Sequence, residues 1–276
     1  MNMAITLFGA ADAMLTSILV GRAASRLWLA ATLLGLSAGL AAAVVVLGGD
    51  AERGWHSRLT LGGEALPLRL EAISAFYLML LCVVGGAASV YEREHWADRT
   101  HPRSSHTGRV WWSVLLLSLG LVLLVSNGRP FLLAWELFTI SAYFLATLNR
   151  QPAVVRAAGW LYLRAAHVAV LALFAFFTLL AARAWSWDLG PMRERADLAP
   201  LFWLALLGFG LKAGLFPLHV WLPSAHANAP SHVSAMLSGV TLKIGIYGLV
   251  RFSGWQPVAG GAGWVVAALG VVSAVL

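Results

Sequence analysis

Long apolar stretches recur along the chain and are separated by short polar connections. A helix that crosses a bilayer needs about 20 consecutive, mostly apolar residues. Seven stretches meet or approach this length: Leu27–Leu47, Ala72–Val90, Val110–Val125, Phe131–Leu148, Trp160–Ala182, Leu201–Leu222 and Val233–Val250. Ala4–Val20 and the run that starts at Ala259 bring the expected number of membrane-spanning helices to nine. The pattern predicts an all-α integral membrane protein.

The connection between the predicted spans Leu27–Leu47 and Ala72–Val90 has a different hydrophobic period. Its leucines alternate with other residues on both sides of Gly62-Gly63; they are Leu59, Leu61, Leu66, Leu68 and Leu70. Alternation around a pair of glycines predicts a small β-hairpin near residues 58–71. We expect the hairpin to lie on the membrane surface, with Pro67 at an edge position, because proline cannot donate to a strand ladder.

The composition agrees with a membrane protein and narrows the chemistry. Of the 276 residues, 60% are hydrophobic and 11% are charged, whereas soluble proteins carry about 25% charged residues. The net charge of +7 comes from arginines scattered through the connections, with no basic face. We therefore expect the lipid bilayer, and no nucleic acid, as a partner. The single cysteine, Cys82, excludes a disulfide framework and an iron–sulfur cluster held by this chain alone.

The arginines also suggest an orientation. They follow the first, third and fifth spans in short connections, for example Arg22 and Arg26 after the first and Arg150 and Arg156 after the fifth. Cytoplasmic loops carry an excess of Lys and Arg. The connections after odd-numbered spans are therefore expected in the cytoplasm, and the amino terminus outside.

Three charged residues lie well inside the strong apolar spans: Glu136, Lys212 and Lys243. The two lysines are the only ones in the chain. Each charge costs about 2.5–3.5 kcal/mol at a helix centre, so an apolar residue would be cheaper to insert. One interpretation is a structural ion pair between Glu136 and Lys212, but such pairs stabilise less than apolar packing. The other is a path of proton-exchanging groups, which suits lysine because arginine does not lose its proton.

The segment around Lys212 carries a second signal. Gly210, Gly214 and Pro217 fall within a few residues of the lysine. Glycine and proline at this density predict a broken helix, and backbone groups freed at membrane depth are tolerated only where protein or a water-filled cavity satisfies them. Broken helices beside ionisable groups are typical of ion sites in transporters.

Histidines provide further polar positions. His219, His226 and His232 cluster after Pro217, and His167 lies within a span. Metal or haem binding is disfavoured because no metal-ligand spacing accompanies them. His167, His219 and His226 are therefore candidate secondary members of a proton path, with helix capping or an interfacial position as the alternative. No cofactor and no metal are expected.

Three sequence stretches carry a family resemblance. They are Gly208-Phe-Gly-Leu-Lys-Ala-Gly, Pro230-Ser-His-Val-Ser-Ala and Trp135-Glu-Leu-Phe. The chain resembles the proton-conducting, antiporter-like membrane subunits shared by respiratory complex I, Mrp-type sodium/proton antiporters and membrane-bound hydrogenases. Within that family it is most similar to the hydrogenase-4 and formate hydrogenlyase branch.

The resemblance implies a repeat of five helices with a broken seventh helix, here residues 109–253. Residues 1–108 would hold the N-terminal helices and the hairpin, and residues 254–276 the start of a further helix. In this scheme Glu136 is the charge partner on the fifth helix and Lys212 accepts a proton on the seventh. Lys243, on the eighth, passes it onward. The family has a second such repeat, so a separate chain is expected to supply it.

The expected function is proton translocation in a bacterial inner (plasma) membrane. The resemblance implies that other membrane and redox subunits, in a hydrogenase or an assembly like NADH-quinone oxidoreductase, carry out the electron transfer, so that this subunit is not itself catalytic. Two alternatives remain open. The chain could belong to a Mrp-type cation/proton antiporter with no redox coupling, or it could be a truncated, non-conducting scaffold.

Overall fold

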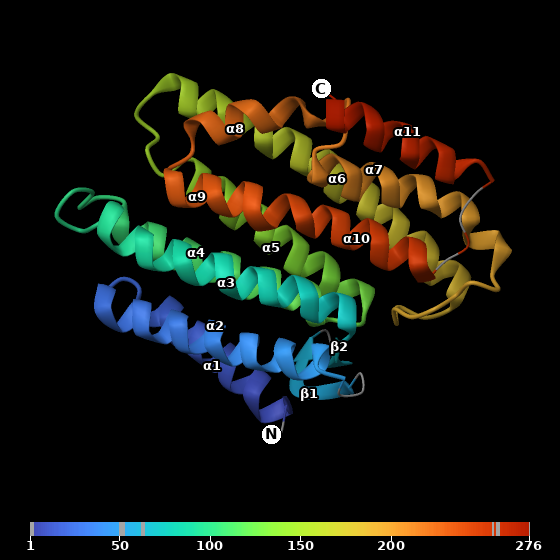
Figure 1. Cartoon of the computed structure of the whole chain (residues 1–276), viewed down its shortest axis with the longest axis horizontal. Coiled ribbons are helices and arrows are strands. Elements are labelled where there is room, and N and C mark those ends of the chain that lie inside the picture. Colours follow the sequence, from blue (N-terminus) through green and yellow to red (C-terminus); the bar gives the residue numbers. More distant parts are fainter. Residues whose placement is uncertain (1–2, 50–52, 62–63, 256, 258–259, 276) are drawn as a thin grey trace.

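The computed structural model describes residues 3–49, 53–61, 64–255, 257 and 260–275. It is a helical bundle with one β-hairpin (Figure 1). The long elements of its first half are α1 (Met3–Val20), α2 (Ser25–Leu47), β1 (Arg53–Leu61), β2 (Glu64–Leu70), α3 (Ala72–His95), α4 (Ser105–Leu124), α5 (Gly128–Ala146) and α6 (Ala153–Ala184). The second half contains α7 (Phe202–Ala213), α8 (Leu222–Asn228), α9 (Ser231–Met236), α10 (Leu242–Trp255) and α11 (Ala262–Val275).

Every stretch predicted to span the membrane contains helix, and the stretch 201–222 is interrupted after Ala213. Among the described residues, six helical segments are long and apolar enough to cross a bilayer: Ser25–Leu47, Ala72–His95, Ser105–Leu124, Ala153–Ala184, Ala196–Asn228 and Ser231–Trp255. The segments Ile5–Val20 and Ala262–Val275 are apolar but shorter. The prediction of an all-α, multi-pass membrane protein is confirmed.

The helices lie side by side in a bundle, with α1 and α2 at one edge and α11 at the other (Figure 1). The α1–α2 pair packs on α3 and α4, and α5 packs on α4 and α6. Between α5, α6, α7 and α10 the core is aromatic, with the fully buried rings of Phe131, Trp135, Phe177 and Phe209 in contact with one another or with Phe252. This packing fixes the relative positions of the helices that carry Glu136 and Lys212.

The hairpin lies beside the end of α4. Strands β1 and β2 pair antiparallel, and Pro67 lies opposite His56. The predicted turn at Gly62-Gly63 lies outside the described residues. A backbone hydrogen bond of 3.1 Å from Ser126 to the Pro67 carbonyl attaches the hairpin to the segment after α4.

The predicted helix break follows Lys212 directly. Helix α7 ends at Ala213 because Gly214 adopts a left-handed conformation with φ 72°, which glycine reaches without steric cost. The amide of Leu215 then bonds the Gly210 carbonyl at 3.0 Å. Pro217 precedes the 3-10 turn Leu218–Trp221, which leads into α8. A π-helical turn, Leu237–Thr241, joins α9 to α10 and was not predicted.

Candidate functional site

Lys212 is enclosed between α5, α6 and α7, and only 2% of the residue is exposed. Its Nζ donates a hydrogen bond to the Tyr162 hydroxyl at 2.8 Å and to the Thr139 hydroxyl at 3.4 Å. The ammonium also lies 3.9 Å from the centre of the Phe138 ring, a distance at which the ring face attracts a cation. The buried charge is therefore held by two hydroxyls and an aromatic face.

Close helix packing sets the position of Lys212. A Cβ placed on Gly245 of α10 would lie 2.5 Å from the backbone nitrogen of Ala213, so only glycine permits this approach. Helix α10 therefore presses against the end of α7 beside the lysine. With the backbone fixed on this side, the side chain extends toward Tyr162 and Thr139 on the other.

Glu136 lies against His167 and not against Lys212, and the contact is an ion pair only when the imidazole is protonated. Its Oε1 lies 3.7 Å from Nε2 of His167, and the two side chains are 30% and 52% exposed. Nδ1 of His167 donates to the Leu163 carbonyl at 2.8 Å, which leaves Nε2 facing the carboxylate. Among the described residues, no ion pair within 4.0 Å joins Glu136 to Lys212.

The hydroxyls that bond the ammonium nevertheless lie on the same two helices as Glu136 and His167. Thr139 lies in the next turn of α5 after Glu136, and Tyr162 lies on α6 before His167. The second oxygen of Glu136, Oε2, is buried and has no hydrogen-bond partner in the described part of the protein. The geometry therefore places a half-exposed acid–imidazole pair within about one helical turn of the hydroxyls that hold Lys212.

Lys243 lies on the outer face of α10. It is exposed together with Ile246 and Val250, and its Nζ donates a hydrogen bond to the Ser238 carbonyl in the π-helical turn. The glycines that face α7 lie on the opposite side of the same helix. The structure does not bring Lys243 into contact with Lys212.

The other candidate histidines also lie apart from Lys212. His226 of α8 bonds the Ser234 hydroxyl through Nδ1 at 3.1 Å. His219 stands in the 3-10 turn beside the Phe216 ring. Within the described residues, no group of three or more His, Cys, Asp or Glu side chains could hold a metal ion.

Several polar residues of the bundle were missed by sequence reasoning. Tyr162 and Thr139 were not predicted as partners of Lys212, although Thr139 follows Glu136 on one helix. A second polar cluster lies at the hairpin end, where Glu71 pairs with the buried Arg251 at 3.6 Å and with Arg69 at 3.5 Å. No sequence signal links these residues, because Glu71 and Arg251 lie at distant points of the chain.

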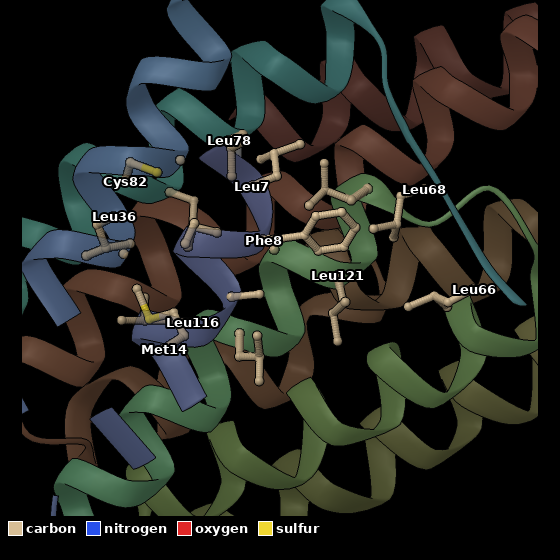
Figure 2. A pocket seen from close by; sticks show the side chains of 18 residues that line it. Leu7, Phe8, Met14, Leu36, Leu66, Leu68, Leu78, Cys82, Leu116 and Leu121 are labelled. Carbon is tan, nitrogen blue, oxygen red and sulfur yellow. The ribbon is translucent and has the colours of Figure 1, made fainter. Parts of the chain in front are cut away.

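A cavity of about 120 Å³ lies away from these groups, between α1, α2, α3 and α4. Figure 2 shows its lining, which includes Leu7, Phe8, Met14 and Leu36. No charged side chain borders it. The cavity therefore offers no group for proton transfer, and the candidate site remains the set of residues around Lys212.

Comparisons with known proteins identify curated relatives of this chain. Hydrogenase-4 component B of Escherichia coli (strain K12) is 33% identical over 191 residues, covering 67% of this chain and 28% of that protein. Formate hydrogenlyase subunit 3 of the same strain is 29% identical over 190 residues, covering 67% and 29%. This chain thus spans less than a third of the length of these curated relatives.

The fold has counterparts among solved structures. A chain of the Mrp complex from Dietzia sp. DQ12-45-1b aligns with a TM-score of 0.75 at 21% identity, covering 92% of this chain and 49% of that one. A chain of the membrane-bound sulfane sulfur reductase, an archaeal respiratory membrane complex, aligns with a TM-score of 0.67 at 23% identity, covering 91% and 40%. At these identities the likeness shows the fold.

The family assignment rests on the sequence match. The family model described as "NADH:quinone oxidoreductase/Mrp antiporter, TM" matches residues 126–276, which include Glu136, Lys212 and Lys243. This match covers more than half of the chain and confirms the resemblance found in the sequence. The protein therefore belongs to the NADH:quinone oxidoreductase/Mrp antiporter family of membrane subunits.

Proposed function

We propose that this chain translocates protons across a bacterial inner membrane, coupled to electron transfer performed by other subunits of a hydrogenase or complex I-like assembly. The observation that carries the proposal is the environment of Lys212. A buried ammonium with hydroxyl partners and no carboxylate contact is costly to keep and able to change its protonation state.

The hydroxyl partners of Lys212 tolerate both of its protonation states. A hydroxyl both donates and accepts hydrogen bonds, whereas a carboxylate only accepts. Tyr162 accepts from the ammonium, and the same hydroxyl can turn to donate to the neutral amine after the proton leaves. A carboxylate in that position would hold the lysine in its charged form. The arrangement therefore supports proton exchange at Nζ of Lys212.

Glu136 and His167 supply a switchable charge beside this site. While His167 is neutral, the carboxylate of Glu136 stabilises the ammonium of Lys212 by its negative charge. When His167 takes a proton, its positive charge compensates the negative charge of Glu136, and the carboxylate then stabilises the ammonium of Lys212 less. A proton arriving at the half-exposed His167 would thus favour release of the proton on Lys212.

Lys243 is proposed as the next acceptor, and its exposed position suggests how the path continues. A charged side chain in the middle of a span normally faces protein or a water-filled cavity. A second five-helix repeat would cover the outer face of α10 and enclose Lys243. We accordingly propose a division into N-terminal helices (1–108), one five-helix repeat (109–253) and the start of a further helix (254–276).

The test is proton uptake by inverted membrane vesicles that contain the assembled complex. We expect Lys212→Ala and Lys212→Arg to lower proton uptake per electron transferred by about 100-fold or more, the range for removal of a positioned proton donor or acceptor. Lys212→Arg keeps the charge and removes only the exchange, so it is the sharper variant. Lys243→Ala tests the onward path. Unchanged proton uptake in both Lys212→Ala and Lys243→Ala would contradict the proposal.

The family match also includes Mrp antiporters, so an antiporter without redox coupling is the second candidate. The same vesicles distinguish the two. A pH change driven by a sodium gradient, with no electron donor present, favours the antiporter. A non-conducting scaffold would show no proton movement under either condition, and Glu136→Gln would then have no effect on any transport measurement.

A further inference from the structure

Two buried titratable groups lie apart from the Lys212 site, at the junction of α3, α4 and α9. Glu92, in the last turns of α3, is 1% exposed, and His232 of α9 is 2% exposed. Neither carboxylate oxygen of Glu92 and neither ring nitrogen of His232 has a hydrogen-bond partner among the described residues. Buried polar atoms without partners are rare in native proteins and indicate water or another bound group.

The same two helices, α3 and α4, border both groups. The His232 ring lies 5.4 Å from the ring of Trp112 and 6.1 Å from that of Trp96. Glu92 lies one turn before Trp96 on α3 and faces α4, where a Cβ on Gly108 would be 3.6 Å from its Oε1. Trp112 lies one turn after Gly108, so the ring that His232 contacts and the glycine beside Glu92 lie on the same face of α4.

The charged neighbours of Glu92 are already occupied. On α4, the buried Arg109 donates to the Gly21 carbonyl and to Asp98, both at 2.7 Å, and its Nη2 contacts His106. Among the described residues, Arg109 therefore makes no hydrogen bond or ion pair with Glu92.

The remaining titratable groups near the junction lie toward the surface. On α3 they are Arg93, Glu94 and His95, and in the connection to α4 they are Asp98 and His101. Arg109 lowers the pKa of Asp98 through its hydrogen bond. Burial lowers the pKa of His101, whose ring stacks on Trp96. From α9 only His232 reaches the junction, so Glu92 has no ion-pair partner within it.

An ionised carboxylate in such a place is very costly unless it is paired and hydrogen-bonded, and a buried group of this kind takes up a proton instead. A neutral carboxyl still needs an acceptor for its O–H and a donor for its carbonyl oxygen, and a neutral imidazole needs both as well. Water molecules can serve all of these atoms at once, since a buried water typically makes about three hydrogen bonds. Metal ions are disfavoured, because the described residues offer no cluster of three ligands.

We propose that Glu92 and His232 form a hydrated proton-holding site, in which Glu92 carries an exchangeable proton and internal water molecules link it to His232. The partly exposed Asp98 and His106, each 44% exposed, mark where this water meets the surface beside Arg109. In an exchange, the proton leaving the Glu92 carboxyl passes to water, and the carboxyl recovers one from the same water. This site shares no residue with Glu136, Lys212 or Lys243 and does not depend on their proposed roles.

Infrared spectroscopy of the purified chain in lipid nanodiscs tests the proposal without any transport measurement. We expect a carbonyl band from a protonated carboxyl that shifts when H₂O is replaced by D₂O, and that is lost completely in Glu92→Gln. Glu71→Gln is the matched control, because Glu71 is also buried, at the N-cap of α3, but pairs with Arg69 and Arg251. The band should persist in Glu71→Gln.

Two milder variants keep the test decisive if Glu92→Gln fails to fold. Gly108→Ala places a methyl group in ordinary contact with Glu92, and His232→Gln removes the imidazole. Each should shift the frequency of the band without removing it, because each changes the water between the two groups. A band that survives in Glu92→Gln, that does not respond to D₂O, or that is identical in both milder variants would overturn the proposal.

Discussion

The two lysines of the chain lie on neighbouring helices and occupy opposite environments. Lys212, at the end of α7, is enclosed and bonds to Tyr162 and Thr139. Lys243, on α10, is exposed and bonds only to a carbonyl of its own helix. The same residue type in a similar apolar stretch of sequence therefore has different surroundings in the fold. The enclosed Lys212 is bonded by side chains of other helices. The exposed Lys243 is not covered by any part of the chain that the structure describes.

The buried arginines sharpen this comparison. Arg251 pairs with Glu71, and Arg109 pairs with Asp98. Both cations therefore have a carboxylate partner within the chain, which keeps their charge fixed. Lys212 differs from them because its partners are hydroxyls. Among the buried cations of the described residues, the one able to lose its proton is also the one without a carboxylate contact.

The largest stability effect is expected where a buried cation has a carboxylate partner. Arg251→Met leaves Glu71 in a buried site with only Arg69, and breaking a buried pair on one side costs about 3–5 kcal/mol. The loss should appear as a lower free energy of unfolding in detergent. Arg69→Met, at a more exposed position, should cost below about 1 kcal/mol. Equal losses in the two variants would show that Arg251 is not the principal partner of Glu71.

A smaller effect is expected for the hydroxyl that holds Lys212. Tyr162→Phe removes a 2.8 Å hydrogen bond to the ammonium, and bonds to charged groups contribute about 1.5–3 kcal/mol. The control is Tyr143→Phe, since the described residues provide no hydrogen bond to the Tyr143 hydroxyl. If both variants lose the same unfolding free energy in detergent, Lys212 does not depend on Tyr162.

The spans, the helix break and the position of Lys212 could be predicted because each has a local cause. Apolar length gives the spans, and the left-handed backbone at Gly214 gives the break. Contacts between helices are different. Whether Glu136 meets Lys212 or His167 depends on how α5 is rotated against α6 and α7, and sequence spacing carries no information about that rotation.

The exposure of Lys243 could be inferred only in retrospect. Gly245 and Gly248 mark the face of α10 that packs closely on Phe209 and Ala213 of α7. Lys243 lies on the other face with Ile246. A glycine face in a membrane helix indicates close packing, but which neighbour it meets requires the three-dimensional arrangement. The ion pair between Glu71 and Arg251 could not be predicted for the same reason, because the two residues are distant in sequence and meet only in the folded bundle.

A weaker, pH-dependent effect is expected at the pair formed by Arg109 and Asp98. The pKa of Asp98 is lowered in the folded protein by the hydrogen bond from Arg109. The ionised Asp98 therefore stabilises the fold fully at a pH above its pKa in the unfolded chain. This stabilisation is lost as the pH falls through the pKa of Asp98 in the folded protein.

Because the Asp98 side chain is 44% exposed, this contribution should stay below about 1 kcal/mol. Thermal unfolding in detergent should show Asp98→Asn less stable than the wild type near neutral pH and equal to it in acid. Glu94→Gln, at a more exposed carboxylate, is the control. A difference that persists or grows in acid would mean that Asp98 acts other than through its charge.

The smallest effect is expected at Lys243, and it tests the comparison of the two lysines directly. Lys243→Met removes an exposed ammonium whose bond is to its own helix, and substitutions at such surface positions change stability by about 0.5 kcal/mol or less. In lipid, removing the charge should if anything favour the membrane-inserted state. Lys212→Met, by contrast, leaves the hydroxyls of Tyr162 and Thr139 without their cation. We therefore expect unfolding of the purified chain in detergent to separate the variants, with a change in unfolding free energy only for Lys212→Met. A comparable change for Lys243→Met would show that Lys243 is enclosed by the described residues, and the need for a covering surface would disappear.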